Sequence, residues 1–374
     1  MNKKIIVSTI VLGLLLTTSI TTATSINKIE LYKDLKTVKS SSFKADFYID
    51  DDAPQEWYNQ TNYKTIQAGV ENASADDIIF VYNGTYSGGI IIDKKICLIG
   101  EDKNTTLING DENEFVIRVE ANETQISGFA IGNSKEGGYG IDVKANNCLI
   151  FENIIICNFI GVVAIWQSGV TIVNNIIDSN EIGINLLFCE KNMIIFNKVY
   201  NNYQGIVLFG LDLIDNSCFN NQICLNEVKN NYRGIDLKMC KDSNIFCNAI
   251  ENNDINGIYI NSSQDTTICL NGIKNNGLSP DPLEEDILPA GIVLDNSDST
   301  VTFNNIKGNK DYGMQVINST VKAKFNYWGA ILGPKLGLFG DRIKVENGQV
   351  NFFPWVPFKI RLAGAIGDWE HLEI

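Results

Sequence analysis

Acidic side chains follow a recurring Gly-Ile pair, where they could serve acid–base chemistry on a sugar. Asp142 and Asp236 each come directly after such a pair, and Asp295 lies two positions further along its own strand. Cleavage of a glycosidic bond needs two carboxyl groups held about 5–10 Å apart. Asp236 and Asp295 fall two repeats apart, which corresponds to about 10 Å, so they are the candidate catalytic pair. Asp142 lies too far along the repeats to join them.

An acidic insertion lies between two repeats close to this pair. It spans residues 278–290 and carries Asp281, Glu284, Glu285 and Asp286. It could overhang the face that holds Asp236, with Arg233 and Tyr259 nearby, and so complete a site for a polysaccharide lyase or a glycoside hydrolase. The alternative interpretation is that all these charges are solvated, on a sheet face and in a surface loop.

Apolar side chains occupy the same outward positions in the intervening repeats. They are Val163, Ile165, Leu187, Val207 and Phe209, flanked by Trp166 and Phe188. An exposed apolar patch usually marks a contact. Three interpretations stay open: cover by the leader or by the segment after Phe209, a partner surface, or stacking against sugar rings. The candidate binding residues are Trp166, Leu187, Phe188, Phe209 and Tyr259.

Three of the nine cysteines recur at one offset in consecutive repeats: Cys189, Cys218 and Cys240. One coil rise between them lies within the Cα separation of a disulfide. The pattern is compatible with a small apolar ladder, with one disulfide beside a free thiol, or with a thiolate metal site. Ser263, Asn296 and Asn318 continue the same offset, and no Cys-x-x-Cys occurs, which argues against metal.

These residues are placed by a repeat of 22 or 23 residues, with single steps of 29 and 33. Each repeat contains a Gly-Ile pair. Each repeat also contributes one residue to an asparagine column, which begins with Glu152, continues through Asn174, Asn197, Asn226, Asn248, Asn271 and Asn304, and ends at Asn326. Such a period is the signature of a solenoid. Apolar residues one and three positions before each asparagine, and again two after it, predict three short alternating strands per repeat. The fold class is therefore all-β, a right-handed parallel β-helix of about ten coils.

The column asparagines are expected to be structural. Asn tolerates a left-handed bend, and its amide can bond to the same residue in the next coil.

The ends of the chain are expected to differ from the repeats. Residues 1–25 have the outline of a secretory signal, although a retained anchor is the alternative; no other segment is long and apolar enough to cross a membrane. A leader at 26–60 precedes a capping helix at 61–76 with Asn62 as N-cap. The β-helix follows at 77–328, then a closing segment at 329–360 and a loose tail at 361–374. Trp328 is expected to plug the last coil.

The Gly-Ile and Asn-x-Ile phrases, Leu98-Ile-Gly-Glu-Asp near the start and Asn326-Tyr-Trp-Gly near the end resemble the pectate-lyase-like β-helix superfamily. Within it the chain most resembles secreted, carbohydrate-associated proteins that include the NosD type. That resemblance implies the fold and a link to copper-enzyme maturation. The copper role is not carried over, because the chain has one histidine, His371, and four methionines.

The net charge of −14 argues against binding to nucleic acid or anionic membranes. It also disfavours a polyanionic sugar unless a cation bridges the two. No cofactor is expected; calcium at Asp50-Asp51-Asp52 is a possibility beside a plain solvated turn. Asn-x-Ser/Thr sequons are compatible with a glycoprotein.

The sequence favours a secreted or cell-surface protein that is not catalytic and that binds glycans or envelope partners. A polysaccharide lyase or hydrolase and a structural spacer are the alternatives.

Overall fold

The computed structural model describes residues 44–211, 218–279, 288–334 and 340–364. All features below belong to one compact unit, Asp46–Ile366. The signal peptide at 1–25, the leader up to residue 43, the acidic side chains at 281–286 and His371 lie outside the described residues. None of the described helices is long and apolar enough to cross a membrane.

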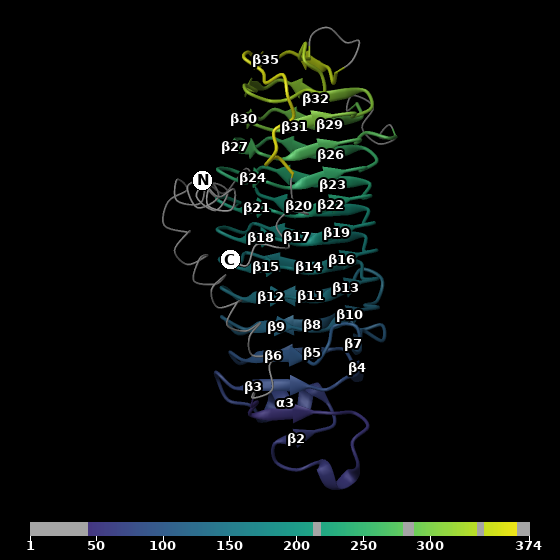
Figure 1. Cartoon of the computed structure of the whole chain (residues 1–374). Coiled ribbons are helices and arrows are strands. Elements are labelled where there is room, and N and C mark those ends of the chain that lie inside the picture. Colours follow the sequence, from purple (N-terminus) through teal and green to yellow (C-terminus); the bar gives the residue numbers. More distant parts are fainter. Residues whose placement is uncertain (1–43, 212–217, 280–287, 335–339, 365–374) are drawn as a thin grey trace, which may run out of the picture. The chain divides into compact units, whose positions relative to one another are not determined.

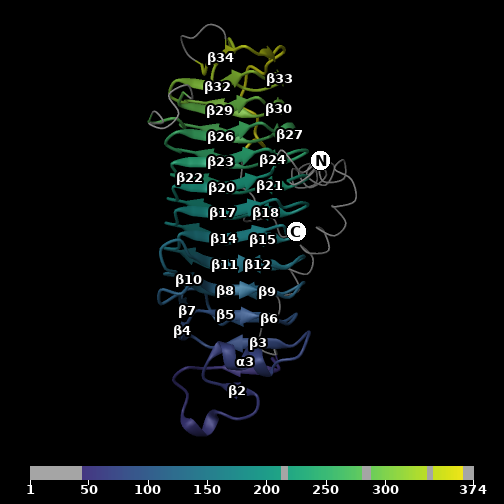
Figure 2. The same ribbon diagram turned by 180° about the vertical axis from the view of Figure 1, so that it is seen from behind.

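Short strands stack into three parallel sheets (Figures 1 and 2). Sheet A contains β1 (Phe47–Ile49), β2 (Asn62–Tyr63), β3 (Ile78–Val81), β6 (Cys97–Gly100), β9 (Gln125–Ser127), β12 (Leu149–Phe151), β15 (Thr171–Val173), β18 (Met193–Ile195), β21 (Gln222–Cys224), β24 (Asn244–Phe246), β27 (Gln264–Cys269), β30 (Asp298–Thr302), β33 (Thr320–Lys322) and β35 (Gln349–Asn351). Sheet B contains β4 (Gly84–Ser87), β7 (Thr106–Asn109), β10 (Ala130–Gly132), β13 (Ile154–Ile156), β16 (Ile176–Asp178), β19 (Lys198–Tyr200), β22 (Glu227–Lys229), β25 (Ala249–Glu251), β28 (Gly272–Lys274) and β31 (Asn305–Lys307).

Sheet C contains β5 (Ile90–Ile92), β8 (Phe115–Val119), β11 (Tyr139–Val143), β14 (Ile160–Ile165), β17 (Ile182–Leu187), β20 (Gln204–Phe209), β23 (Arg233–Lys238), β26 (Asn256–Asn261), β29 (Ala290–Asp295), β32 (Tyr312–Ile317) and β34 (Ile343–Glu346). From β12 to β31 the chain visits sheets A, B and C in turn, so each coil contributes one strand to each sheet. The result is a parallel β-helix, as the repeat predicts.

The core consists of inward-facing aliphatic residues that stack on their counterparts in the next coil. In sheet A, Ile150 pairs with Ile172 and Ile172 with Ile194, and all three are buried. Equivalent stacks fill sheets B and C. Each fully buried aliphatic side chain contributes roughly 1.5–3 kcal/mol of transfer free energy, so the stacked core is the main stabilising element.

Each coil bends between its sheets through residues in the left-handed conformation. From sheet A to sheet B these include Phe196, Leu225, Cys247, Leu270, Phe303 and Phe325. From sheet B to sheet C they include Cys157, Ser179, Asn201, Asn230, Asn252 and Asn275. Asparagine accepts this conformation more readily than most residues, which explains its frequency at the second bend.

Two ladders of buried asparagines run beside these bends. In the first, Asn175 donates from both its backbone N–H and its Nδ2 to Oδ1 of Asn197, at 3.0 Å each, and the pattern repeats from Asn153 to Asn326. The second ladder runs from Asn158 to Asn309 and ends at Asp341, whose Oδ2 lies 2.6 Å from Nδ2 of Asn309. The amides saturate backbone groups that the bends leave unpaired.

The first ladder corrects the register expected for the opening repeats. Asn153 and Asn175 occupy the ladder, whereas Glu152 and Asn174 lie at the bend with left-handed φ angles of 53° and 54°. The residue before each ladder asparagine therefore takes the bend and does not point into the core. This reassignment moves the inward position of the following strand from Ile154 to Ile155.

The N-terminal helix is shorter than expected. Helix α3 spans Ile66–Asn72, and Thr65 is its N-cap, accepting a hydrogen bond from the Ala68 N–H. Asn62 lies instead in β2, which pairs with β1, so part of the expected leader extends sheet A. Ile66 and Val70 of α3 are buried in the core. A short 3₁₀ helix, η1 (Gln55–Trp57), lies between β1 and β2.

At the other end, Trp328 is completely buried in the core. The chain then returns toward earlier coils after β35. The Ile360 N–H donates to Oδ1 of Asn305 at 2.8 Å, and the Gly364 N–H donates to the Leu270 carbonyl at 3.0 Å. Residues 361–364, expected to begin a loose tail, are thus hydrogen-bonded to the β-helix.

Candidate functional site on the outer face of sheet C

Two columns of side chains cover the face of sheet C that points away from the core. The central column contains Arg118, Asp142, Val163, Asn185, Val207, Asp236, Tyr259, Val293 and Gln315. The edge column, two residues further along each strand, contains Ile165, Leu187, Phe209, Lys238, Asn261, Asp295 and Ile317. Most of the central column is buried although it faces away from the core.

The aspartates of the central column are buried and ion-paired, so they are not the solvated charges of the simpler interpretation. Asp142 Oδ2 lies 2.7 Å from Arg118 Nε and 3.7 Å from Lys144 Nζ. Asp236 is 1% exposed, and its Oδ2 lies 3.4 Å from Arg233 Nη1. These cations neutralise carboxylates that burial would otherwise disfavour.

The two aspartates of the predicted catalytic pair, Asp236 and Asp295, lie in different columns of sheet C. Asp236 belongs to the central column and Asp295 to the edge column, so they differ by two coils and by two positions along the strand. These offsets are about 10 Å and about 7 Å, which together exceed the usual separation of paired carboxyl groups. Asp295 is also held by Asn261 Nδ2 at 2.9 Å and by Asn296 Nδ2 at 3.0 Å.

Tyr259 is buried beneath this charged cluster and offers no surface for a ligand. Its ring lies 5.1 Å from the Arg233 guanidinium carbon and 5.6 Å from Lys238 Nζ, and Asn261 Nδ2 donates to its hydroxyl at 3.1 Å. The cluster around Asp236 therefore serves as a packed polar element of sheet C.

The apolar part of the face ends in a row of aromatic rings, in which Phe188 and Phe209 are half-buried. Val163 and Val207 are buried, whereas Trp166 is 52% exposed. The ring centroids of Trp166 and Phe188 lie 4.5 Å apart, and those of Phe188 and Phe209 lie 6.0 Å apart. We call Trp166, Phe188 and Phe209 the aromatic row; it crosses three consecutive coils where sheet C turns toward sheet A.

Trp166 and Phe188 also hold a left-handed backbone conformation. Their φ angles are 63° and 56°, and the equivalent bend in later coils holds Met239, Ser262, Asn296 and Asn318. A large aromatic residue in the left-handed region costs of order 1–3 kcal/mol. Aromatic residues also hold this conformation at the bend from sheet A to sheet B, at Phe196, Phe303 and Phe325, so the conformation alone does not select this bend. The exposed indole ring of Trp166 against Phe188, beside the apolar part of sheet C, makes this bend the candidate site.

Asn185 adds a polar group to the apolar part of the face. It lies between Val163 and Val207 in the central column. Its Oδ1 is buried and accepts no hydrogen bond from any described residue. An unsatisfied buried carbonyl costs about 1–3 kcal/mol, so stability alone does not account for an asparagine here.

The cysteines of the repeat belong to a third ladder, beside the bend from sheet C to sheet A. We call it the corner row: Cys189, Cys218, Cys240, Ser263, Ser297 and Ser319. Ser263 Oγ accepts from the Cys240 N–H at 3.0 Å, and Cys189 Sγ accepts from the Gln167 N–H at 3.3 Å. The serines that continue the row are Ser297 and Ser319, while Asn296 and Asn318 of the expected offset lie at the bend.

Burial makes these thiols poor metal ligands. It raises the pKa of Cys189 to about 12 and that of Cys240 well above its ordinary value. A thiol must be deprotonated to bind a metal. Among the described residues, the acidic or thiol groups close enough to share an ion are Asp50, Asp51 and Asp52, with ligand atoms within 4.8 Å. Asp51 already accepts a hydrogen bond from the Thr85 N–H, and calcium binding there stays a prediction.

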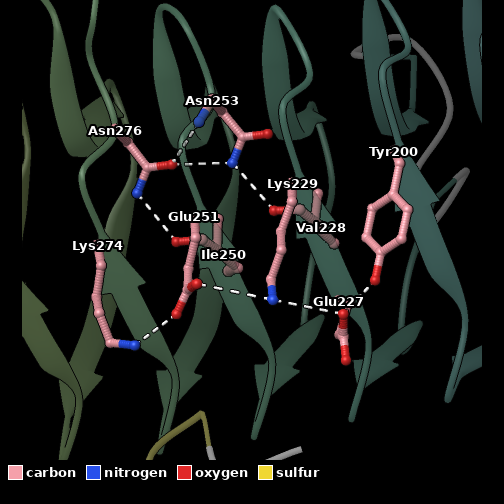
Figure 3. A network of polar contacts seen from close by, with 9 residues as sticks. All are labelled: Tyr200, Glu227, Val228, Lys229, Ile250, Glu251, Asn253, Lys274 and Asn276. Carbon is pink, nitrogen blue, oxygen red and sulfur yellow. Dashed lines mark hydrogen bonds and ion pairs between the residues drawn. The ribbon is translucent and has the colours of Figure 1, made fainter.

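Two surface features escaped the sequence analysis. Phe303 and Phe325 stack at 5.4 Å at the bend between sheets A and B, both partly exposed. On sheet B, an ionic network links Tyr200, Glu227, Lys229, Glu251 and Lys274 across four coils (Figure 3). The ionic network could have been predicted from the Lys and Glu residues at the outward positions of β22, β25 and β28. The charged members of the network are paired with one another.

Comparisons with known proteins agree with this architecture. The family model described as "Right handed beta helix region" matches residues 213–326. This chain is a right-handed parallel β-helix protein. No curated protein matches its sequence.

Solved structures similar to this β-helix protein share little sequence with it. The A-module of the Azotobacter vinelandii mannuronan C-5 epimerase AlgE4 is 15% identical, with a TM-score of 0.53 over 83% of this chain and 98% of that module. The enzymatically active domain of bacteriophage CBA120 tailspike protein 2 is 14% identical, with a TM-score of 0.63 over 83% of this chain and 52% of that chain. A mutant DFA-IIIase from Arthrobacter chlorophenolicus A6, in complex with DFA-III, is 11% identical, with a TM-score of 0.56 over 82% and 93%. At these identities the likeness shows the fold alone.

Proposed function

We propose that this β-helix protein binds glycans along the aromatic row and does not cleave them. The observation that carries the proposal is the exposed indole ring of Trp166, which lies against the half-buried ring of Phe188 beside the apolar part of sheet C. Aromatic rings bind the apolar faces of sugars while their surroundings supply hydrogen bonds. Phe209 extends the row by one coil with an edge-to-face contact to Phe188, and a linear glycan running along the row would meet one ring per coil.

The ion-paired aspartates support binding in preference to catalysis. Asp142 is ion-paired with the half-buried Arg118 and Asp236 with the buried Arg233, and Asp295 accepts hydrogen bonds from two amides. A general acid needs a carboxyl group within reach of the substrate oxygen, and none of these three side chains is presented in that way. The similar structures include a mannuronan epimerase and a tailspike domain, which supports a carbohydrate ligand but also names the alternative, an enzyme.

The proposed setting is the extracellular space or the cell surface. The signal-like outline of residues 1–25 supports it. A glycan or another envelope component is the partner available there.

A glycan array combined with a polysaccharide-degradation screen, with and without calcium, tests the proposal. Wild type should bind at least one glycan class and release no fragments, and Trp166→Ala should lose that binding. Phe303→Ala is the matched control, because Phe303 is also a stacked, exposed aromatic at a left-handed bend. Fragment release that Asp236→Asn abolishes would establish the enzyme instead. Equal loss of binding in both aromatic variants would remove the aromatic row as the site.

A further inference from the structure

Two cysteines of the corner row are held in register by neighbouring coils. Phe219 forms a parallel bridge with Lys241, and the residues before them are Cys218 and Cys240. The Lys241 N–H donates to the Cys218 carbonyl at 2.8 Å. Paired parallel strands lie about 4.8 Å apart, and disulfides accept Cα separations of about 4.4–6.8 Å. The backbone therefore already has the spacing of a disulfide.

The side-chain positions also favour a pair between Cys218 and Cys240. The two sulfur atoms of Cys218 and Cys240 lie 2.6 Å apart, whereas non-bonded heavy atoms prefer about 3.5–4 Å. Cys189 is also in register with Cys218, through the bridge between Glu190 and Phe219. Its thiol is directed instead to the carbonyls of Ala164 and Leu187, at 3.3 and 3.2 Å.

We propose that Cys218 and Cys240 are a site of oxidative modification, joined by a disulfide when the protein folds in the presence of a small-molecule disulfide such as oxidised glutathione. One cysteine thiolate attacks the external disulfide and releases one thiol; the second attacks the mixed disulfide and releases the other. The two cysteines lose two protons and two electrons, and the oxidant is reduced to two thiols. Cys189 stays a thiol.

The thiol–disulfide exchange takes place during folding and not in the folded protein. Cys218 and Cys240 are each 2% exposed, so neither an oxidant nor a reductant reaches them once the coils have stacked. The crosslink also has a structural role at this position. The repeat step from Cys189 to Cys218 is 29 residues, whereas the step from Cys218 to Cys240 is 22, and closing a longer loop costs conformational entropy. A disulfide to the next coil holds the chain in register directly after the longer step.

The test is to unfold the reduced full chain and refold it in buffers of oxidised or reduced glutathione. Each sample is then denatured, alkylated and mapped by mass spectrometry. In the oxidised sample, alkylation should reach every cysteine except Cys218 and Cys240, which appear as one crosslinked peptide. The oxidised form should melt about 3–6 °C above the reduced form.

Matched variants separate the disulfide from general packing. Cys240→Ser and Cys218→Ser should each lose the crosslinked peptide and melt at the same temperature in both buffers. Cys189→Ser should keep the crosslink, because serine fills the same role at Ser263, Ser297 and Ser319. Alkylation of all nine cysteines after oxidative refolding, or a peptide linking Cys189 to Cys218, would overturn the proposal. The mass readout on wild type decides the matter even where a variant fails to fold.

Discussion

The indole ring of Trp166 lies 4.5 Å from the phenyl ring of Phe188, centroid to centroid, across two adjacent coils. Both residues hold left-handed backbone conformations, and later coils place Met239, Ser262, Asn296 and Asn318 at this bend. The pair thus combines a strained backbone with an exposed apolar surface at Trp166. A contact with a ligand explains both features at once, which is the basis of the proposed function.

Replacing Trp166 by asparagine should separate binding from folding. Asparagine fits the left-handed bend, as at Asn296 and Asn318, so the unfolding midpoint in urea should stay level or rise slightly. Glycan affinity should fall about 10-fold or more, as for a truncated binding hot spot. A variant with lowered stability and unchanged affinity would assign Trp166 a purely structural role.

Asn185→Val should stabilise the protein. The substitution removes a buried Oδ1 that accepts no hydrogen bond from the described residues and continues the valines at positions 163 and 207. The expected gain is about 1 kcal/mol in unfolding free energy, measured by urea denaturation. A loss of 1 kcal/mol or more would show that Asn185 has a stabilising partner.

The asparagine ladder should be among the most sensitive elements of the fold. Asn226 Oδ1 accepts from the N–H and Nδ2 of Asn197, and its own Nδ2 donates to the Ile194 carbonyl. Asn226→Ala leaves these buried groups unsatisfied and should cost about 3–5 kcal/mol.

The control is Asn230→Gly, at an exposed left-handed bend of the same coil. It should change stability by about 0.5 kcal/mol or less, because glycine adopts that conformation without strain. Similar losses in the two variants would contradict the distinction between ladder and bend.

Asp341 should give stability a specific pH dependence. Burial raises the pKa of Asp341 above its usual 3.8, despite hydrogen bonds from Asn309 and from the Gly308 N–H. Because the folded-state pKa exceeds the unfolded one, its contribution to stability is fully present below pH 3.8 and is lost as the pH rises through the folded value.

Comparing wild type with Asp341→Asn isolates this group, since both proteins share every other carboxylate. The urea midpoint of wild type relative to the variant should fall as the pH rises from 3.8. A constant difference across that range would mean that the carboxyl group is not perturbed.

The sequence was sufficient for the architecture but not for its register at the start. The period of 22 or 23 residues fits either member of the neighbouring pair Asn174 and Asn175, since one asparagine suits a bend and the other a ladder. The choice depends on which amide reaches Asn197, which is a contact between coils. From Asn197 onward the predicted column asparagine is the one in the ladder, whereas the residue before it, predicted to face the core, lies at the bend.

Burial on the outer face could not be predicted either. The alternation of apolar and polar residues along the strand places Asp236 on the face away from the core. It does not indicate whether that position is buried. Its burial follows from Arg233 within the same strand and from Tyr259 on the next coil. Such clusters arise when long side chains from stacked strands cover their neighbours, which a single-strand pattern does not contain.

The most direct test of the account is calorimetric titration of wild type, Trp166→Asn and Phe303→Asn with the best glycan from the array, followed by chromatography of the same mixtures. The account predicts binding by wild type and Phe303→Asn, at least about 10-fold weaker binding by Trp166→Asn, and intact glycan throughout. Unchanged affinity of Trp166→Asn, or shortened glycan in the wild-type mixture, would contradict it.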